Sequence, residues 1–291
     1  MMNSTSTIRV VTDSTCDLPP NVVQSLGITV IPLTVLFGTE ELRDGVDITA
    51  EQFFRRLGRE KELPTTAAPG PGVFRTVYER LLAEGATEIV SIHVSSKLSA
   101  TLESARQGGA GLPVTFVDSL QVSLALGVPV MEAARAIQQG ATAEQAAAVA
   151  LDTARRTQIF FTLETLEYLR RGGRMSRGQE FFGSLLQIKP VITVQDGEVH
   201  PAARMRTKQK AVEELLRRCA EMRPVSTVFA LHASTPDELA HLRDRLHGLA
   251  PDSRYVESRI TPVIGVHVGP GAVSAGVTRA PDEQSPSFLP T

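Results

Sequence analysis

The sequence of 291 residues contains no tryptophan, and aromatic residues make up only 5% of the chain. Its two cysteines, Cys16 and Cys219, are too few for a disulfide framework or a cysteine-rich metal site. Each is expected to be a small buried residue. Hydrophobic residues, at 42%, are abundant enough for a globular fold, so the core must be built mainly from aliphatic side chains.

An excess of charge of one sign is also missing. The chain has 30 Lys and Arg against 32 Asp and Glu, a net charge of -2, and lacks the basic footprint typical of nucleic-acid-binding proteins. No apolar run approaches the ~20 residues that a membrane helix needs, and residues 1–7 contain no hydrophobic signal core. We therefore expect a cytoplasmic protein that binds no nucleic acid and has no integral membrane segment.

The patterns of common catalytic and cofactor sites are absent as well. Neither Gly-x-x-x-x-Gly-Lys-Ser/Thr nor Gly-x-Gly-x-x-Gly occurs, and there is no Gly-x-Ser-x-Gly nucleophile elbow. Asp13, Asp44, Asp47 and Asp118 are dispersed without a recognisable metal-ligand spacing. We expect no catalytic residue, metal or cofactor. An enzyme acting on an acyl or small carboxylate substrate is the alternative interpretation.

Strand-like and helix-like segments alternate along the first half of the chain. The sequence predicts strands over residues 8–12, 28–37, 89–94 and 114–117, and helices over 19–26, 50–57, 73–83, 128–138 and 143–157. Residues 95–107 predict a polar turn that enters a helix. Residues 63–71 are rich in Pro, Thr, Ala and Gly and predict a loop. This alternation indicates an α/β fold with a parallel sheet and helices on both of its faces.

The second half has a different pattern. We predict strands over 159–162, 225–232, 253–260, 265–268 and 273–277, helices over 163–169, 208–219 and 235–246, and a hairpin over 191–203 around the turn-forming Asp196-Gly197. A domain boundary near residues 153–158 divides the chain. We expect an N-terminal domain over 1–155, a C-terminal α/β domain over 156–280 and a disordered tail over 281–291.

Three hydroxyl-rich loops follow predicted strands, at the sheet edge where open parallel sheets bind ligands. They are Asp13-Ser14-Thr15, the run from Ser95 to Thr101, and Asp118-Ser119. The second loop offers hydroxyl and backbone N–H groups at a helix start, which suits an anion. Without a basic fork, it fits a single carboxylate or a neutral polar head group better than a triphosphate. The alternative is that these residues are ordinary helix N-caps.

A histidine and two basic clusters complete the candidate residues. His267 lies in a predicted apolar strand before Gly269-Pro270-Gly271, where a polar group needs a partner. It is either a hydrogen-bonded core residue or a ligand contact. Residues 170–174 and 204–206 are basic, and each cluster is either solvated surface charge or a contact for a partner or an anion.

Taken together, these motifs resemble those of the DegV family of fatty-acid-binding proteins. The resemblance extends from Ile8 to about Val277, and it rests on the shared order and spacing of motifs that are individually weak. The motifs are Asp13–Pro19, Ile31–Leu33, Asp44–Thr49, Pro64–Pro69, Ser95–Thr101, Val117–Ser119, Leu169–Arg174, Lys189-Pro190 and His267–Gly271.

The resemblance implies a two-domain α/β fold, an N-terminal Rossmann-like parallel-sheet domain and a C-terminal domain with a fatty-acid tunnel. It implies a long-chain fatty acid as ligand and no catalytic activity. It further implies the acyl-carrier subunit of a bacterial fatty acid kinase. A separate, dihydroxyacetone-kinase-like subunit would use ATP to phosphorylate the carboxylate, and the acyl-phosphate would serve phospholipid synthesis.

The resemblance also implies roles for individual residues. Thr66, Ser99 and His267 match the positions that contact the fatty-acid carboxylate, and Arg174 matches a surface arginine used with the kinase partner. Arg206 is a second, weaker candidate. The chain departs from the family pattern at Ala67, Ala68 and Ala100, where Ser, Gln and Gly are common. These departures bear on head-group solvation and ligand preference.

Apolar segments of the second half are expected to line the tunnel, where each buried CH₂ of an acyl chain contributes about 0.8 kcal/mol. They include Phe181-Phe182, Leu185–Ile188, Val191-Ile192 and Val263-Ile264. The same residues are equally suited to an ordinary core.

Overall fold

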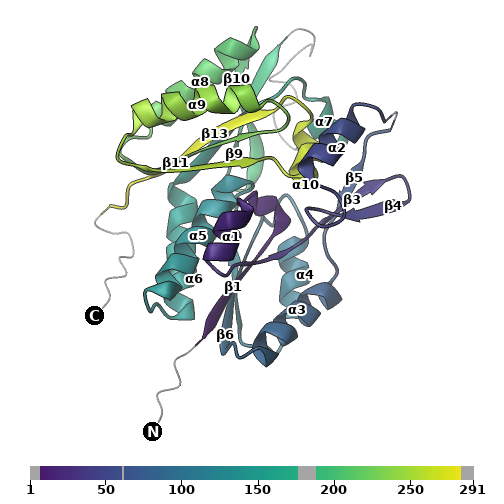
Figure 1. Cartoon of the computed structure of the whole chain (residues 1–291), viewed down its shortest axis with the longest axis vertical. Helices are drawn as coiled ribbons and strands as arrows, with labels where there is room; N and C mark the ends of the chain where they lie inside the picture. Colours follow the sequence, from purple (N-terminus) through teal and green to yellow (C-terminus); the bar gives the residue numbers. More distant parts are fainter. Residues whose placement is uncertain (1–6, 61, 176–187, 283–291) are drawn as a thin grey trace.

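The computed structural model describes residues 7–60, 62–175 and 188–282 (Figure 1). The first sheet is parallel and contains, in spatial order, β2 (Thr29–Ile31), β1 (Ile8–Asp13), β6 (Glu88–His93) and β7 (Val114–Asp118). Helices α5 (Leu124–Gln138) and α6 (Ala143–Arg156) cover one face, and α3 (Pro71–Ala83) and α4 (Thr101–Gly108) cover the other. The predicted parallel sheet with helices on both faces is confirmed.

The second sheet is mixed. Its spatial order is β10 (Glu198–Met205), β9 (Lys189–Gln195), β8 (Thr157–Thr162), β13 (Val273–Arg279), β11 (Val225–His232) and β12 (Arg254–Arg259). Helices α8 (Lys208–Ala220) and α9 (Pro236–Leu249) cover its outer face. The predicted hairpin is confirmed, because Asp196 and Gly197 have φ angles of 49° and 80° and connect β9 to β10.

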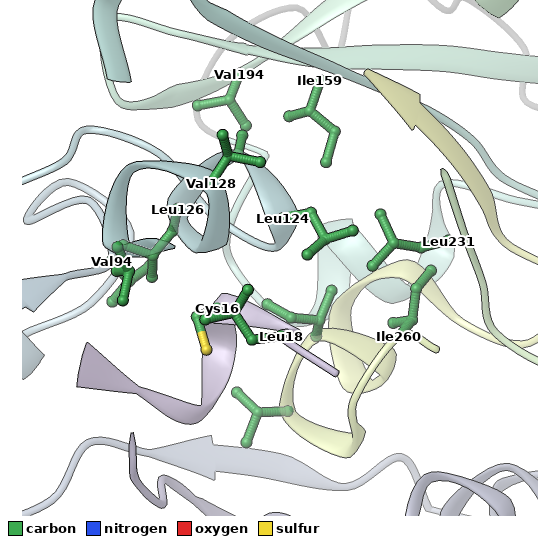
Figure 2. Packing of buried hydrophobic residues seen from close by; sticks show 14 of the residues in the cluster. Cys16, Leu18, Val94, Leu124, Leu126, Val128, Ile159, Val194, Leu231 and Ile260 are labelled. Carbon is green, nitrogen blue, oxygen red and sulfur yellow. The ribbon is translucent and has the colours of Figure 1, made fainter. Parts of the chain in front are cut away.

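The two halves of the chain meet in one apolar core. Figure 2 shows Leu124 and Val128 of α5 beside Ile159 of β8, Val194 of β9 and Leu231 of β11. The chain enters the second sheet at Thr157, next to the boundary expected at residue 155. Residues from both halves therefore share one core where they meet.

A small third sheet contains β4 (Glu40–Arg43), β3 (Thr34–Phe37) and β5 (Thr65–Ala67). Two segments of this region differ from the prediction. The extended stretch predicted over 28–37 is divided between β2 and β3, because Pro32 cannot donate to a continuing ladder. The loop predicted over 63–71 contains β5, which pairs antiparallel with β3. A strand as short as β5 has too few residues for a sequence pattern to predict it, so it is recognised only from its pairing with β3.

The strand predicted at His267 is also wrong, because this residue lies in helix α10 (Pro262–Val268). Pro262 occupies the first turn, where its missing N–H costs nothing, and Gly269 ends the helix with a φ of 76°. A short run of apolar residues cannot be assigned to strand or helix by periodicity alone. Helix α10 packs on α2 (Ala50–Leu57), where a Cβ on Gly265 would lie 2.6 Å from the Phe53 ring.

Smaller features complete the fold. Helix α2 begins with a capping box of Thr49 and Gln52, and Cys16 and Cys219 are both buried as predicted. The remaining elements are a 3-10 helix η1 (Ser14–Cys16), α1 (Pro20–Ser25) and α7 (Glu167–Arg171), which begins later than predicted. In the part of the chain that the structure describes, no helix combines the length and hydropathy of a membrane span. Residues 283–291 of the expected tail lie outside the described residues.

Candidate ligand-binding site

An apolar cavity lies where the two halves of the chain meet. It contains about 620 Å³ of empty space, open solvent included. Its apolar lining comes from both halves: Leu33, Val94, Leu98, Val122, Phe161, Leu169, Ile192, Val194, Val199, Val263, Ile264 and Val268. Its polar lining consists of Thr15, Thr66, Ser99, Arg174 and His267. Such a lining favours a long apolar ligand with a small polar head.

Four of the polar residues that line the cavity are together called the polar cluster here: Thr66, Ser99, Arg174 and His267. The hydroxyl oxygen of Thr66 lies 3.2 Å from Nε2 of His267. The guanidinium of Arg174 donates from Nε to the carbonyl of Leu98, next to Ser99, at 3.2 Å. The fold therefore brings together four residues that are spread over 201 positions of the chain.

A second hollow lies beyond the polar cluster. This outer groove contains about 830 Å³ and shares Thr66, Arg174 and His267 with the cavity. The rest of its lining is Glu62, Leu63, Pro64, Thr65, Tyr168, Arg171, Gly172 and Val266. The three shared side chains therefore form a wall common to both hollows.

The electrostatics of the polar cluster suit an anion. Burial, together with the nearby charge of Arg174, lowers the pKa of His267 from 6.5 to about 4, so the imidazole is neutral at pH 7. Arg174 is half-buried, which lowers its pKa, but an arginine stays charged at neutral pH. Among the described residues, no carboxylate pairs with Arg174 or lines the cavity. Toward the cavity, the cluster therefore presents hydrogen-bond donors and a positive charge, with no carboxylate among the described lining residues.

Local structure fixes each member of the cluster. Thr66 lies on β5, opposite Val35 of β3. Ser99 precedes the first turn of α4 and is hydrogen-bonded to Thr101, with 2.7 Å between the two hydroxyl oxygens. His267 lies against Gly172, where a Cβ would be 2.3 Å from Nδ1, so only glycine leaves room for the imidazole.

Comparisons with known proteins agree with this architecture. The family model described as "Uncharacterised protein, DegV family" matches residues 7–280. A DegV domain-containing protein of Streptomyces coelicolor is 35% identical, over 93% of this chain and 98% of its own length. The chain belongs to the DegV family.

Solved structures of DegV proteins are similar to this chain over almost its whole length. The DegV family protein of Thermus thermophilus, whose structure is described as showing fatty acid binding, is 34% identical with a TM-score of 0.86. DegV of Bacillus subtilis, described as a fatty acid binding protein, is 30% identical with a TM-score of 0.84. Each similarity covers 94% of this chain and 99% of the other.

Most hydroxyls of the three hydroxyl-rich loops form hydrogen bonds within the protein. The hydroxyl of Thr15 donates to Asp13 at 2.5 Å, and the hydroxyl of Ser14 accepts from the backbone N–H of Leu33. Ser95 donates to the carbonyl of Gly197 at 2.7 Å, and Ser119 donates to the carbonyl of His93. Ser99 differs from these residues. It lines the cavity, and within the described structure the hydrogen bonds of its hydroxyl oxygen are made with Thr101, at the end of the same loop.

One cluster that the sequence did not indicate is a buried chain of hydrogen bonds. Asp13 Oδ2 accepts from Nδ1 of His93 at 2.9 Å, Ser91 lies 2.7 Å from Nε2 of His93, and Tyr78 lies 2.7 Å from Ser91. All four side chains are buried away from the cavity. This Ser-His-Asp arrangement holds β1, β6 and α3 together and offers no substrate access. The sequence did contain one signal for this cluster, because Asp13 and His93 are polar residues that each end an apolar strand.

Other predicted residues lie in varied places. Arg174, expected on the surface, is half-buried between the cavity and the outer groove. Arg206 is exposed after β10 and lines neither hollow. Val191 faces α8, whereas Ile192, Val263 and Ile264 line the cavity as expected. The expected tunnel residues from Phe181 to Leu186 lie outside the described residues.

The described ranges contain no group of three or more His, Cys, Asp or Glu residues that could hold a metal ion.

Proposed function

We propose that this protein binds a long-chain fatty acid in the cavity, with the carboxylate at the polar cluster. The observation that carries the proposal is the apolar cavity whose polar lining offers donors and one cation but, among the described residues, no carboxylate. An acyl chain gains about 0.8 kcal/mol for each CH₂ removed from water. Thr66 and Ser99 both line the cavity, which supports a role for their hydroxyls as donors to the carboxylate.

We further propose that the protein presents this carboxylate to a separate ATP-dependent kinase subunit, giving an acyl-phosphate for phospholipid synthesis. The shared wall between cavity and groove supports this step, because Thr66, Arg174 and His267 face both hollows. A head group held at that wall stays within reach of a partner while the acyl chain is covered. Arg171, which is ion-paired with Glu167, and Arg174 line the groove beside the carboxylate of Glu62, and the guanidinium of Arg174 is suited to docking or to an incoming phosphoryl group.

A carrier role without catalysis is consistent with the hydrogen bonds of the cluster. Ser99 is paired with Thr101, so no base contacts it among the described residues. The imidazole of His267 lies near Thr66, but its Nδ1 has no hydrogen-bond partner within the described structure. An activated nucleophile needs a base that a third group orients. We therefore favour the carrier over an enzyme acting on an acyl or small carboxylate substrate.

Fatty-acid titration of matched variants tests the proposal. A hydrogen bond to a charged group contributes about 1.5–3 kcal/mol, so Ser99→Ala or Thr66→Val should each weaken binding by about tenfold or more. Ser96→Ala is the control, because Ser96 is exposed on the same loop and does not line the cavity. Unchanged affinity in the Ser99→Ala/Thr66→Val double variant would remove these residues from the site.

A further inference from the structure

Ser99 can serve as donor or acceptor, and its neighbour Thr101 bears on which role it takes. Two contacts join these residues: the hydroxyl oxygens are 2.7 Å apart, and the backbone N–H of Thr101 donates to Oγ of Ser99 at 3.3 Å. Thr101 is fully buried at the start of α4 and does not line the cavity, whereas Ser99 does. Thr101 can therefore act on a ligand only through Ser99.

The direction of the hydroxyl–hydroxyl bond follows from the burial of Thr101. A buried O–H needs an acceptor, and Ser99 Oγ is the one that Thr101 reaches among the described residues. A serine oxygen accepts at most two hydrogen bonds and donates one. With the N–H and O–H of Thr101 both donating to it, the proton of Ser99 is left for the cavity. A chain of donors of this kind also strengthens the last bond in the chain.

We propose that Thr101 is a positioning residue that fixes Ser99 as a hydrogen-bond donor, so that the site selects an ionised carboxylate over a neutral alcohol head group. This inference rests on the proposed function and adds a specificity determinant to it. A carboxylate can only accept, so it needs the positioned proton. An alcohol can donate as well as accept, so it can bind a serine in either orientation.

The experiment measures dissociation constants for palmitate and for the alkanol of the same chain length. Thr101→Val keeps the shape of the side chain and removes the hydroxyl. It should weaken palmitate binding by about tenfold and change alkanol binding by less than about twofold. Thr101→Ser should restore palmitate binding to within about twofold of the wild type, because it restores the donor. Ser99→Ala/Thr101→Val should bind palmitate no more weakly than Ser99→Ala, because Thr101 acts only through Ser99.

Two results would overturn the inference while leaving the proposed function intact. One is unchanged palmitate binding in Thr101→Val, and the other is an equal loss for palmitate and alkanol, which would mark a merely structural role. Failure of the folded wild type to bind palmitate at all would instead remove the proposed function, and the role of Thr101 with it. Circular dichroism of each variant identifies any that fails to fold. If Thr101→Val fails to fold, palmitate binding by Thr101→Ser decides: binding within about twofold of the wild type supports the inference, and a loss of about tenfold in a folded variant overturns it.

Discussion

Arg174 brings a positive charge to the junction of cavity and groove. Its guanidinium donates to the carbonyls of Leu98 and Gly172, at 3.2 and 2.7 Å, which leaves other N–H groups for a ligand or partner. The side chain is half-buried, so its charge is only partly screened by solvent. The same position suits attraction of a carboxylate and contact with an incoming kinase.

Arg174→Ala separates these two roles. We expect phosphoryl transfer by the kinase subunit to fall by more than tenfold, because the positive charge facing the partner is lost. Fatty-acid affinity should fall by no more than about tenfold, since the hydroxyl donors remain. Titration with fatty acid and a coupled transfer assay measure the two effects. Loss of fatty-acid binding with normal transfer of the remaining complex would contradict this assignment, and Arg155→Ala, exposed on α6 and outside both hollows, is the control.

At the residue scale, the motifs that resemble those of the DegV family indicated all four members of the polar cluster. Thr66, Ser99, Arg174 and His267 were all named from the sequence, and the structure places them on the same cavity wall. Their hydrogen-bond directions could not be predicted. The pairing of Ser99 with Thr101 depends on burial and on the local backbone at the start of α4, which a one-dimensional pattern does not contain.

At the element scale, the β9–β10 hairpin forms a wall of the cavity and is attached to the first half of the chain. It supplies Ile192, Val194 and Val199 to the lining. Its turn docks on Ser95, whose hydroxyl donates to the carbonyl of Gly197. A Cβ on Gly197 would lie 2.5 Å from that hydroxyl, so the contact is close. Opening of this contact would expose the acyl chain.

Ser95→Ala should therefore speed release of bound fatty acid. A neutral hydrogen bond contributes about 0.5–1.5 kcal/mol, so we expect the dissociation rate to rise about two- to tenfold. Stopped-flow displacement of a fluorescent fatty acid measures this rate. Ser96→Ala, the exposed neighbour, should leave it unchanged. Equal rates in both variants and the wild type would show that the hairpin contact does not control release.

The elements themselves were predictable where their local signals agreed. The parallel strands, the capping box of α2 and the Asp196-Gly197 hairpin follow from propensity and turn chemistry. Helix α10 and strand β5 were missed for a physical reason. Both are short, and both are defined by their neighbours, α10 by packing on α2 and β5 by pairing with β3.

At the scale of the whole molecule, two buried carboxylates connect the halves at the start of α10. Asp17 accepts from the hydroxyl of Ser123 at 2.6 Å and from the backbone N–H of Thr261 at 3.0 Å. Asp44 accepts from the backbone N–H of Val263 at 3.4 Å. Burial raises the pKa of both carboxyls from 3.8 to about 7, and the charge of Asp17 contributes to the rise at Asp44.

The sign of the resulting pH dependence follows from these raised values. Folded protein binds both protons more tightly than the unfolded chain, so this stabilisation is full below about pH 4 and is lost as the pH rises through about 7. Asp44→Asn removes one titration. The wild type loses the stabilisation from Asp44 as the pH rises, whereas the Asp44→Asn variant does not. The free energy of unfolding of the variant, minus that of the wild type, should therefore increase by roughly 1–3 kcal/mol between about pH 5 and about pH 8. Urea unfolding at several pH values measures the difference.

Asp47→Asn is the matched control for this experiment. Asp47 is exposed and paired with Arg43, and the hydrogen bonds from Arg43 lower its pKa to about 2. It stays ionised across the same range, so its difference from the wild type should not depend on pH. A flat difference for Asp44→Asn as well would show that Asp44 does not titrate in this window.

The central claim is that this molecule carries one fatty acid in the cavity between its halves. The most direct measurement is native mass spectrometry of the purified protein, followed by denaturation and analysis of an organic extract. We expect one fatty acid per chain, released on denaturation, with the extract giving its chain length and saturation. A folded protein that is empty and takes up neither oleate nor palmitate would contradict the account and leave only the fold assignment standing.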